Sequence, residues 1–379
     1  MAACGVSVTT YPATDRPSPR AATTSASRPP SADPTDLATP SPPADSASPT
    51  ADPAVSERVT AFFYPWYRNV SFDGAWVHWN QLKHSPPDDI ASSFYPVRGP
   101  YSSADPAVMA DQMRELVAAH VGVISVSWWG QGSIEDKVLP GLFAAAAAAN
   151  IRIAFHLEPY QGQTAASMVA DIHYLLGKYG SSPALYRVAR PTASDASTAP
   201  RPVFYVFAAS RFAPADLKAE LAALRRTADD AIVLVHSPKA VSATRVGADG
   251  VYTYDAMADP AALASLVADC RAADLLCSPS VAPGFDNRQA VATGQIVVDR
   301  ANGARYDAMW QAVIGAGAEW VSVTTFNEWH EGTQIEPARV YAAGGRTYLS
   351  FEGAYGKTGT AAETAYLDRT AMWVTRFAG

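Results

Sequence analysis

The chain has only three cysteines among its 379 residues, and it contains no cluster of basic residues. Three cysteines cannot form the disulfide framework that holds small secreted domains together. The formal net charge of −7 and the isoelectric point near 5.5 argue against nucleic acid and anionic membrane surfaces as partners, because both attract basic protein surfaces. A neutral ligand is compatible with this composition.

Histidines and carboxylates at the spacing of a zinc motif are also missing. His156 and Glu158 lie two residues apart on a predicted strand, so their side chains point the same way. They could be metal ligands, a hydrogen-bonded pair or sugar contacts, but no further ligand follows at a zinc-like spacing. We therefore expect no metal ion and no other cofactor.

The first 57 residues are poor in apolar and aromatic side chains. They hold 11 of the 29 prolines and a single aromatic residue, Tyr11, so we predict that residues 1–57 are a disordered linker rich in Pro, Ser and Thr. Met1–Gly5 resembles the end of a bacterial lipoprotein signal, in which Cys4 would become lipidated, although the apolar segment expected before it is missing. Cys4 is either a lipidation site that could tether the protein to a membrane or a chance residue. We expect an extracytoplasmic protein that is secreted or anchored to the bacterial surface.

Residues 58–379 alternate short apolar runs with helical patterns, and 48% of the whole chain is hydrophobic. The predicted strands are 59–67, 121–129, 151–160, 202–209, 231–237, 250–257, 275–282 and 319–326. The clearest predicted helices are 105–120, 134–150, 164–179, 214–227, 261–273, 300–315 and 361–377. This order predicts an α/β fold, a (β/α)8 TIM barrel in one catalytic domain. Cys270 and Cys277 fall at a helix end and in the next strand, where they could form a disulfide or remain free thiols.

The segment Val321–Ala338 is the strongest indication of chemistry. An apolar, β-branched run ends abruptly in Asn-Glu-Trp-His-Glu, which includes Glu328 and Glu331. Each buried unpaired charge costs several kcal/mol, so an active site is the natural interpretation of two carboxylates at this place. The other predicted strands also end in aromatic and polar residues, and Trp and Tyr rings stack on sugars while carboxylates bind hydroxyls. A carbohydrate cleft at the carboxyl ends of the strands follows from this pattern.

Long collinear motifs carry a resemblance to a known family. They are FFYPWYRNVSFDGAWVHWN, PPDDIASSFYPVRGPYSSADP, SVSWWGQG, FHLEPY, DGVYTY, PSVAPGFDNR and the block that follows Asn327. In these segments the chain resembles glycoside hydrolase family 99, the endo-α-1,2-mannosidases, over about residues 58–379. Pro65, Arg68 and Val97-Arg98 depart from the commonest residues of the family, which affects the expected shape of the sugar subsites and not the chemistry.

The resemblance implies a retaining, endo-acting hydrolase that cleaves α-1,2-mannosidic bonds in mannan or high-mannose N-glycans through a 1,2-anhydro sugar. It implies that Glu328 is the general base on O2 and that Glu331 is the general acid and base. The implied sugar-contacting residues are Tyr64, Trp129, His156, Glu158, Tyr252, Tyr254, Arg288 and Asn327. Trp129 favours a bacterial enzyme that accepts mannan, and we expect a monomer.

Two alternatives belong to other classes of protein. One is a catalytically inactive, carbohydrate-binding barrel on a lipoprotein tether, which is disfavoured because both Glu328 and Glu331 are present. The other is a metal-dependent hydrolase, which would require His156, Glu158 and His330 to converge on one ion.

Overall fold

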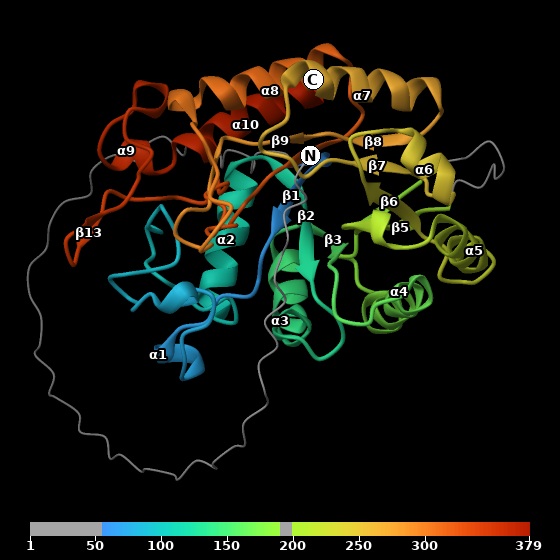
Figure 1. Cartoon of the computed structure of the whole chain (residues 1–379), viewed down its shortest axis with the longest axis horizontal. Helices are drawn as coiled ribbons and strands as arrows, with labels where there is room; N and C mark the ends of the chain where they lie inside the picture. Colours follow the sequence, from blue (N-terminus) through green and yellow to red (C-terminus); the bar gives the residue numbers. More distant parts are fainter. Residues whose placement is uncertain (1–54, 190–198) are drawn as a thin grey trace, which may run out of the picture. The chain divides into compact units, whose positions relative to one another are not determined.

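The computed structural model describes residues 55–189 and 199–379, and in this part of the chain parallel strands form a closed barrel (Figure 1). The barrel strands are β1 (Ser56–Phe63), β2 (Val121–Trp128), β3 (Arg152–Leu157), β5 (Arg201–Val206), β6 (Ile232–His236), β7 (Gly250–Tyr252), β8 (Leu276–Ser278) with β9 (Ser280–Val281), and β12 (Val321–Val323). Each pairs in parallel with its neighbours, and β1 closes the ring by pairing with both β2 and β12. The predicted (β/α)8 barrel is confirmed.

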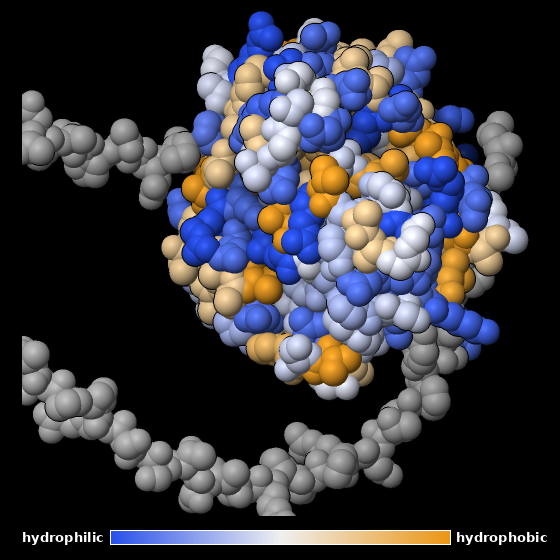
Figure 2. Space-filling model, turned by 90° about the vertical axis from the view of Figure 1, so that its left-hand side faces the viewer, coloured by the Kyte–Doolittle hydropathy of each residue, from blue (hydrophilic) through white to orange (hydrophobic). Residues whose placement is uncertain are grey.

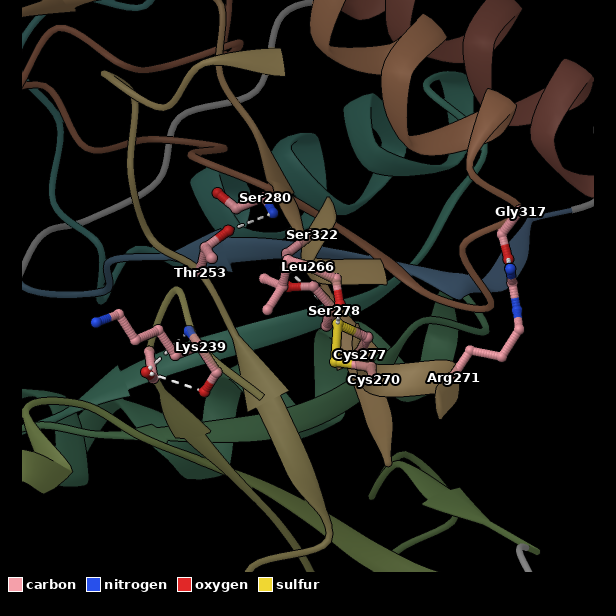
Figure 3. Close-up of a disulfide and its surroundings, with 11 residues drawn as sticks. Lys239, Thr253, Leu266, Cys270, Arg271, Cys277, Ser278, Ser280, Gly317 and Ser322 are labelled. Atoms are coloured by element: carbon pink, nitrogen blue, oxygen red, sulfur yellow. Dashed lines mark hydrogen bonds between the residues drawn. A yellow bond between two sulfur atoms is a disulfide. The ribbon is translucent and has the colours of Figure 1, made fainter. Parts of the chain in front are cut away.

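The seventh barrel strand is interrupted at Pro279, which separates β8 from β9. Proline has no N–H to donate to a neighbouring strand. The backbone N–H of Ser280 instead donates to the Thr253 hydroxyl at 2.8 Å (Figure 3). β8 pairs with β7 and β9 pairs with β12, so the break does not open the barrel.

Helices cover the outside of the barrel, and α7, α8 and α10 run together along one side of it (Figure 1). The helices are α1 (Val70–Asp73), α2 (Pro106–Ala118), α3 (Ile134–Ala148), α4 (Ala165–Tyr179), α5 (Pro214–Leu224), α6 (Val241–Val246), α7 (Pro260–Ala272), α8 (Ala304–Gly315), α9 (Thr360–Glu363) and α10 (Ala365–Ala378). Asp105 caps α2 by accepting from the Ala107 N–H at 2.8 Å, and Pro106 occupies the first helical position, which needs no N–H donor.

Short strands and 3-10 helices lie in the loops of the barrel. They are the strands β4 (Arg187–Val188), β10 (Phe285–Asp286), β11 (Val297–Val298), β13 (Ala342–Ala343) and β14 (Arg346–Thr347), and the 3-10 helices η1 (Gln81–Lys83), η2 (Ala209–Arg211), η3 (Ala301–Gly303) and η4 (Ala354–Gly356). β10 and β11 form a small antiparallel pair next to the loop after β12, because the Asp286 N–H donates to the Glu331 carbonyl at 2.6 Å.

The predicted strands all correspond to observed strands, and the main differences are at helix ends. The predicted helix 300–315 begins as an α-helix only at Ala304, because Asn302 and Gly303 have φ values of 50° and 98°. The predicted helix 361–377 is divided into α9 and α10, and α6 was not among the clear predictions. The predicted linker lies outside the described residues except for its last three, and β1 begins at Ser56, two residues before the predicted boundary.

Hydrogen bonds between small polar side chains fill part of the barrel interior. The hydroxyls of Ser278 and Ser322 lie 2.9 Å apart, and those of Thr60 and Tyr205 lie 3.3 Å apart. Pairing buried hydroxyls with each other avoids the cost of leaving them unsatisfied. These four side chains are buried, so this part of the barrel interior is filled by paired hydroxyls.

Cys270 near the end of α7 and Cys277 in β8 form a disulfide, with Cα atoms 5.9 Å apart (Figure 3). Of the two possibilities that the sequence left open, the structure has the disulfide. On the face shown in Figure 2, hydrophobic residues are scattered among hydrophilic ones. Among the described residues, no helix has both the length and the apolar character needed to cross a bilayer.

Candidate active site

The two candidate catalytic carboxylates lie in the loop that follows β12. The Glu328 N–H donates to the Thr325 hydroxyl at 2.8 Å, and Glu328 Oε1 accepts from the His330 N–H at 3.0 Å, so a tight turn fixes one edge of this carboxylate. The other oxygen, Oε2, is buried and has no hydrogen-bond partner among the described residues. A buried carboxylate oxygen that is left free is unusual, and it is available to a ligand.

Burial raises the pKa of both carboxyls. The pKa of Glu331 rises to about 7, chiefly because the group is desolvated, with a further contribution from the charge of Glu158. The pKa of Glu328 rises well above its usual value for the same reason, and the nearby Glu331 charge adds to the effect. Near neutral pH the pair therefore holds a proton, as general acid catalysis requires.

Tyr254 contacts Glu331 directly, and Tyr64 is linked to it through Tyr254. Tyr254, which follows β7, donates to Glu331 Oε2 at 2.9 Å. Tyr64, which follows β1, donates to the Tyr254 hydroxyl at 2.8 Å. The resulting chain of hydrogen bonds orients the Glu331 carboxyl, and both predicted tyrosines are brought together with it.

Asn327 holds the end of β1 against the end of β12. Its side-chain carbonyl accepts from the Tyr64 N–H at 2.7 Å, and its amide group donates to the Tyr64 carbonyl at 3.1 Å. Asn327 is fully buried, so it acts on the site through the backbone of Tyr64. This geometry gives Asn327 a positioning role, and its contact with a sugar stays a prediction.

A third carboxylate, Glu158, directly follows β3 and is bound by Ser127 of β2. Glu158 Oε1 accepts from the Ser127 hydroxyl at 2.9 Å, and the Trp129 indole N–H donates to the same hydroxyl at 3.0 Å. His156 Nδ1 lies 2.9 Å from Glu158 Oε1, outside hydrogen-bond geometry, and His156 Nε2 lies 2.7 Å from the Tyr252 hydroxyl. The predicted residues of β2, β3 and β7 thus form one connected group.

Aromatic rings form a wall beside Glu328. Trp66 stacks on His78 with ring centroids 4.3 Å apart and on Trp129 at 6.2 Å. His330 Nε2 lies 2.8 Å from the His78 carbonyl, which can only accept, so this nitrogen carries the proton. Burial lowers the pKa of His330 to about 4 and also lowers the pKa of His78, so both rings are neutral at pH 7.

Sequence reasoning did not select Trp66 or His78 as site residues. Trp66 could have been found from its position, because it lies among the aromatic residues that follow the apolar run of the first predicted strand. No local pattern indicates His78, because it lies in an irregular loop and takes part through its stacking on Trp66 and the bond of its carbonyl to His330. The loop could not be placed over the barrel from sequence.

Arg288 lies further from the carboxylate pair. Its guanidinium donates to both carboxylate oxygens of Asp286, at 3.0 and 2.6 Å. These two residues help to line a cavity of about 280 Å3 that also includes Gly332, the neighbour of Glu331. The structure places Arg288 beside the site, and its contact with a sugar stays a prediction.

The residues of the metal-dependent alternative do not converge. Across residues 55–189 and 199–379, no group of three or more His, Cys, Asp or Glu side chains is arranged to hold a metal ion. His330 instead bonds to the His78 carbonyl, while His156 bonds to Tyr252. The structure gives no support to a site made by His156, Glu158 and His330.

Comparisons with known proteins agree with this geometry. The profile of glycosyl hydrolase family 99 matches residues 54–379. A glycoprotein endo-α-1,2-mannosidase from Mus musculus is 32% identical over 362 residues, covering 86% of this chain and 76% of the relative. One from Xenopus laevis is 33% identical over 314 residues, covering 73% of this chain and 69% of the relative.

A solved structure matches in three dimensions as well. The family 99 endo-α-mannosidase from Bacteroides thetaiotaomicron has a TM-score of 0.77 and 33% identity, covering 86% of this chain and 98% of that one. A glycoside hydrolase-like protein with 15% identity and a TM-score of 0.60 shares the fold. A match of the family over the whole barrel, with both loop carboxylates in place, identifies this chain as a member of glycosyl hydrolase family 99 and therefore as a glycoside hydrolase.

Proposed function

We propose that this enzyme is a retaining, endo-acting hydrolase that cleaves internal α-1,2-mannosidic bonds in mannan or high-mannose N-glycans and releases an α-1,3-linked disaccharide. The names of the relatives, glycoprotein endo-α-1,2-mannosidase and endo-α-mannosidase, support the choice of bond and sugar. The observation that carries the proposal is the pair of buried carboxyls, Glu328 and Glu331, in one loop, with the pKa of Glu331 at about 7.

In the first step the sugar supplies its own nucleophile. Glu328 takes the proton of the 2-hydroxyl, O2 attacks C1, and the C1–O bond to the leaving chain breaks. Glu331 gives its proton to the departing oxygen, so a 1,2-anhydro sugar and a free hydroxyl result. The free and buried Oε2 atom of Glu328 is suited to accept the hydrogen bond of the 2-hydroxyl.

In the second step water opens the anhydro sugar. Glu331, now a carboxylate, takes a proton from the water that attacks C1, the C1–O2 bond breaks, and Glu328 returns its proton to O2. C1 is inverted twice, so its configuration is retained. Both carboxyls end in their starting protonation states, and the balance is one water consumed for each bond cleaved.

This mechanism needs Glu328 ionised while Glu331 is protonated, although burial raises the pKa of both. Two interacting carboxyls titrate as a pair, and their partners decide which one holds the proton. The N–H of His330 stabilises the Glu328 anion. A bound 2-hydroxyl would donate to the same carboxylate, while a glycosidic oxygen would accept from Glu331, so substrate binding itself favours the required distribution.

We propose that Trp129, Tyr64, His156, Glu158, Tyr252, Tyr254 and Arg288 hold the glycan. The Trp129 and Trp66 rings offer faces for stacking on the C–H surface of a sugar. Glu158 keeps accepting capacity on its second oxygen for a hydroxyl, and Arg288 lines the neighbouring cavity, which has the aromatic walls Phe285 and Phe351.

The proposal is tested by product analysis of a defined mannan and of a glucosylated high-mannose glycan. We expect a mannosyl- or glucosyl-α-1,3-mannose product with retained anomeric configuration, as seen by NMR, and no loss of turnover with a chelator. Glu328→Gln and Glu331→Gln should abolish turnover. An analogue that lacks the 2-hydroxyl of the cleaved mannose should not react, whereas its 4-deoxy counterpart should. Cleavage of the 2-deoxy analogue would eliminate the anhydro mechanism.

We propose further that the enzyme acts outside the cytoplasm, either secreted or tethered through a lipid on Cys4. The disulfide between Cys270 and Cys277 supports an oxidising compartment, since such bonds are rare in the cytosol. Mass spectrometry of the protein isolated from its native membranes would test the tether. An unmodified Cys4 there, or reduced thiols at both other cysteines, would contradict this location.

A further inference from the structure

Glu336 is a buried carboxylate that the mechanism above does not use. It lies eight residues beyond Glu328 in the same loop, and its side chain is completely buried. Oε1 accepts from Arg98 Nε at 3.1 Å and from Gln112 Nε2 at 2.9 Å. Oε2 accepts from the Tyr101 hydroxyl and from Trp329 Nε1, both at 2.8 Å. Four donors therefore converge on one carboxylate, two from the segment 98–101, one from α2 and one from the loop after β12.

The charge of Glu336 is compensated by Arg98. The guanidinium of Arg98 also pairs with two carboxylates on α2, those of Glu115 and Asp111. Three carboxylates therefore surround it, including Glu336. A fully hydrogen-bonded and paired charge is tolerated in the interior, whereas the loss of one partner is costly. This arrangement fixes Glu336 against α2 and makes it a rigid anchor for whatever else it contacts.

Two of the four donors connect this anchor to the catalytic loop. Trp329 stands between Glu328 and Glu331 in the chain, and its indole N–H reaches Glu336. The Tyr101 hydroxyl, which donates to Glu336, also accepts from Asn327 Nδ2 at 3.3 Å. Glu336 thus holds Trp329 directly and Asn327 through Tyr101, and these two residues flank Glu328 in the chain.

The backbone of the loop returns to the same place. The N–H groups of Ile335 and Glu336 both donate to the Phe326 carbonyl, at 3.1 and 2.8 Å, so the segment that carries Glu336 lies against the start of the loop. The loop is therefore closed at its base by backbone bonds and fixed at its centre by the Trp329 side chain.

We propose that Glu336 is a positioning residue for hydrolysis, which holds Trp329 and Tyr101 so that Glu328 and Glu331 keep the separation and direction that proton transfer needs. The inference rests on the proposed catalytic roles of Glu328 and Glu331. In the part of the chain that the structure describes, Glu336 forms no hydrogen bond with either of these carboxylates, and it acts through the indole between them.

The substitution Glu336→Gln tests this with little change in volume. A glutamine presents an oxygen to one pair of donors and an NH2 group to the other, whichever way it is turned. Arg98 carries a charge, so the oxygen is expected to face Arg98 and Gln112. The NH2 group then faces Tyr101, whose hydroxyl can rotate and accept, and Trp329, whose N–H cannot accept. The indole N–H loses its 2.8 Å bond to Glu336 and keeps the longer bond to the Tyr101 hydroxyl, at 3.2 Å, while the ring packing remains.

We expect kcat of Glu336→Gln to fall on the order of 100-fold, since small misplacements of reacting groups have effects of this size, with KM within about twofold. Trp329→Phe removes the same N–H from the other side and should reduce kcat similarly. The double variant should be no worse than the poorer single variant, because each single variant already lacks the bond between Trp329 Nε1 and Glu336.

Glu115→Gln is the matched control. It also removes one carboxylate from Arg98, but Glu115 bonds to Arg98 and not to Trp329 or Tyr101 in the described residues. We expect Glu115→Gln to keep kcat within about twofold of the wild type. Thermal unfolding of all variants shows whether each is folded, and activity is expressed per folded active site.

The pH profile separates positioning from a general loss of structure. Glu331 is faced by Tyr254 after β7, by Tyr64 behind it, by Glu158 after β3 and by Glu328 in its own loop. If the loop loosens, water reaches Glu331 and its pKa falls toward the usual range. The alkaline limb of the kcat profile should then move to lower pH in Glu336→Gln and stay in place in Glu115→Gln.

The positioning role of Glu336 and the catalytic roles of Glu328 and Glu331 can fail separately. Wild-type kcat and an unmoved pH profile in folded Glu336→Gln would overturn the positioning role, while inactivity of Glu328→Gln and Glu331→Gln would leave the proposed mechanism standing. Turnover in either of these two variants would overturn the mechanism and the inference with it. Additive losses in the double variant would also contradict a shared bond between Glu336 and Trp329.

Discussion

At the scale of single residues, the hydrogen bond from Tyr254 to Glu331 controls the pH range of the acid. The bond stabilises the Glu331 carboxylate and so lowers its pKa, which burial raises to about 7. Hydrolysis requires the protonated acid, and activity is lost as pH rises through this pKa. In Tyr254→Phe the pKa should be higher, because the anion loses a donor. We expect the alkaline limb of kcat/KM to move up by about one to two pH units, since a bond to a charged group contributes about 1.5–3 kcal/mol and one pKa unit corresponds to about 1.4 kcal/mol.

Tyr306→Phe is the control for this prediction. Tyr306 is also fully buried and its hydroxyl lies 2.9 Å from that of Thr370, but this pair is between α8 and α10, away from the carboxylates. Its removal should leave the pH profile unchanged. A downward shift of the limb in Tyr254→Phe would mean that the tyrosine does not stabilise the Glu331 anion.

The same raised pKa has a cost in stability. Glu331 releases its proton near pH 4.5 when unfolded and near pH 7 when folded, so the folded state binds more protons in this range and stability falls as pH rises through it. Each pKa unit corresponds to 1.36 kcal/mol, which gives about 3 kcal/mol in total. Glu331→Gln should therefore gain stability relative to the wild type between pH 4 and pH 8. The difference in the free energy of unfolding between the two proteins should change by up to about 3 kcal/mol in favour of the variant.

Chemical denaturation at both pH values measures this difference. At pH 4 both proteins carry a neutral side chain at position 331, so this comparison serves as the internal control for the substitution itself. An equal difference between the two proteins at pH 4 and pH 8 would show that Glu331 ionises normally in the folded enzyme.

At the scale of elements, the loop after β12 depends on a close approach between Gly332 and β10. Gly332 has a φ of 60°, and a Cβ atom there would lie 2.9 Å from the Asp286 carbonyl oxygen and 3.1 Å from its nitrogen. Gly332→Ala must push Asp286 away and strain the bond from its N–H to the Glu331 carbonyl. We expect kcat to fall on the order of 10- to 100-fold, because Glu331 moves with its backbone.

Gly344→Ala provides a matched control for the backbone strain. Gly344 has a φ of 57°, almost the same as Gly332, but a Cβ atom there would meet nothing within 4 Å. Both variants suffer the penalty of a left-handed alanine, about 1 kcal/mol, and Gly332→Ala alone creates a clash. Steady-state kinetics should show normal kcat for Gly344→Ala, and equal losses in both variants would contradict the proposed contact.

Elements were predictable where local patterns are strong. The barrel strands were recognised because each is a short apolar run, and the start of α2 because Asp105-Pro106 is a capping pattern. The start of α8 was misplaced, since the left-handed residues Asn302 and Gly303 are set by packing against Tyr355, which no local pattern reveals.

At the scale of the whole molecule, the barrel brings together side chains that are far apart in the chain. The proximity of Glu328 and Glu331 could be read from the sequence because they share one loop. The bond of Tyr254 to Glu331 and the four donors around Glu336 could not, because these contacts depend on loops whose path is decided by tertiary packing. The pattern predicted which rim of the barrel carries the site, and only the structure shows which side chain bonds to which.

Closure of the barrel also predicts how much of the N-terminal part the enzyme needs. The described residues begin at Val55, and β1 pairs with both β2 and β12 and leads directly into Tyr64. Deletion of residues 1–52 should leave kcat, KM and the unfolding temperature unchanged, because every proposed site residue and both neighbours of β1 remain. Deletion of residues 1–63 should abolish folding, since two open strand edges replace one closed ring. Loss of activity in the shorter deletion would show that the barrel is not sufficient for catalysis.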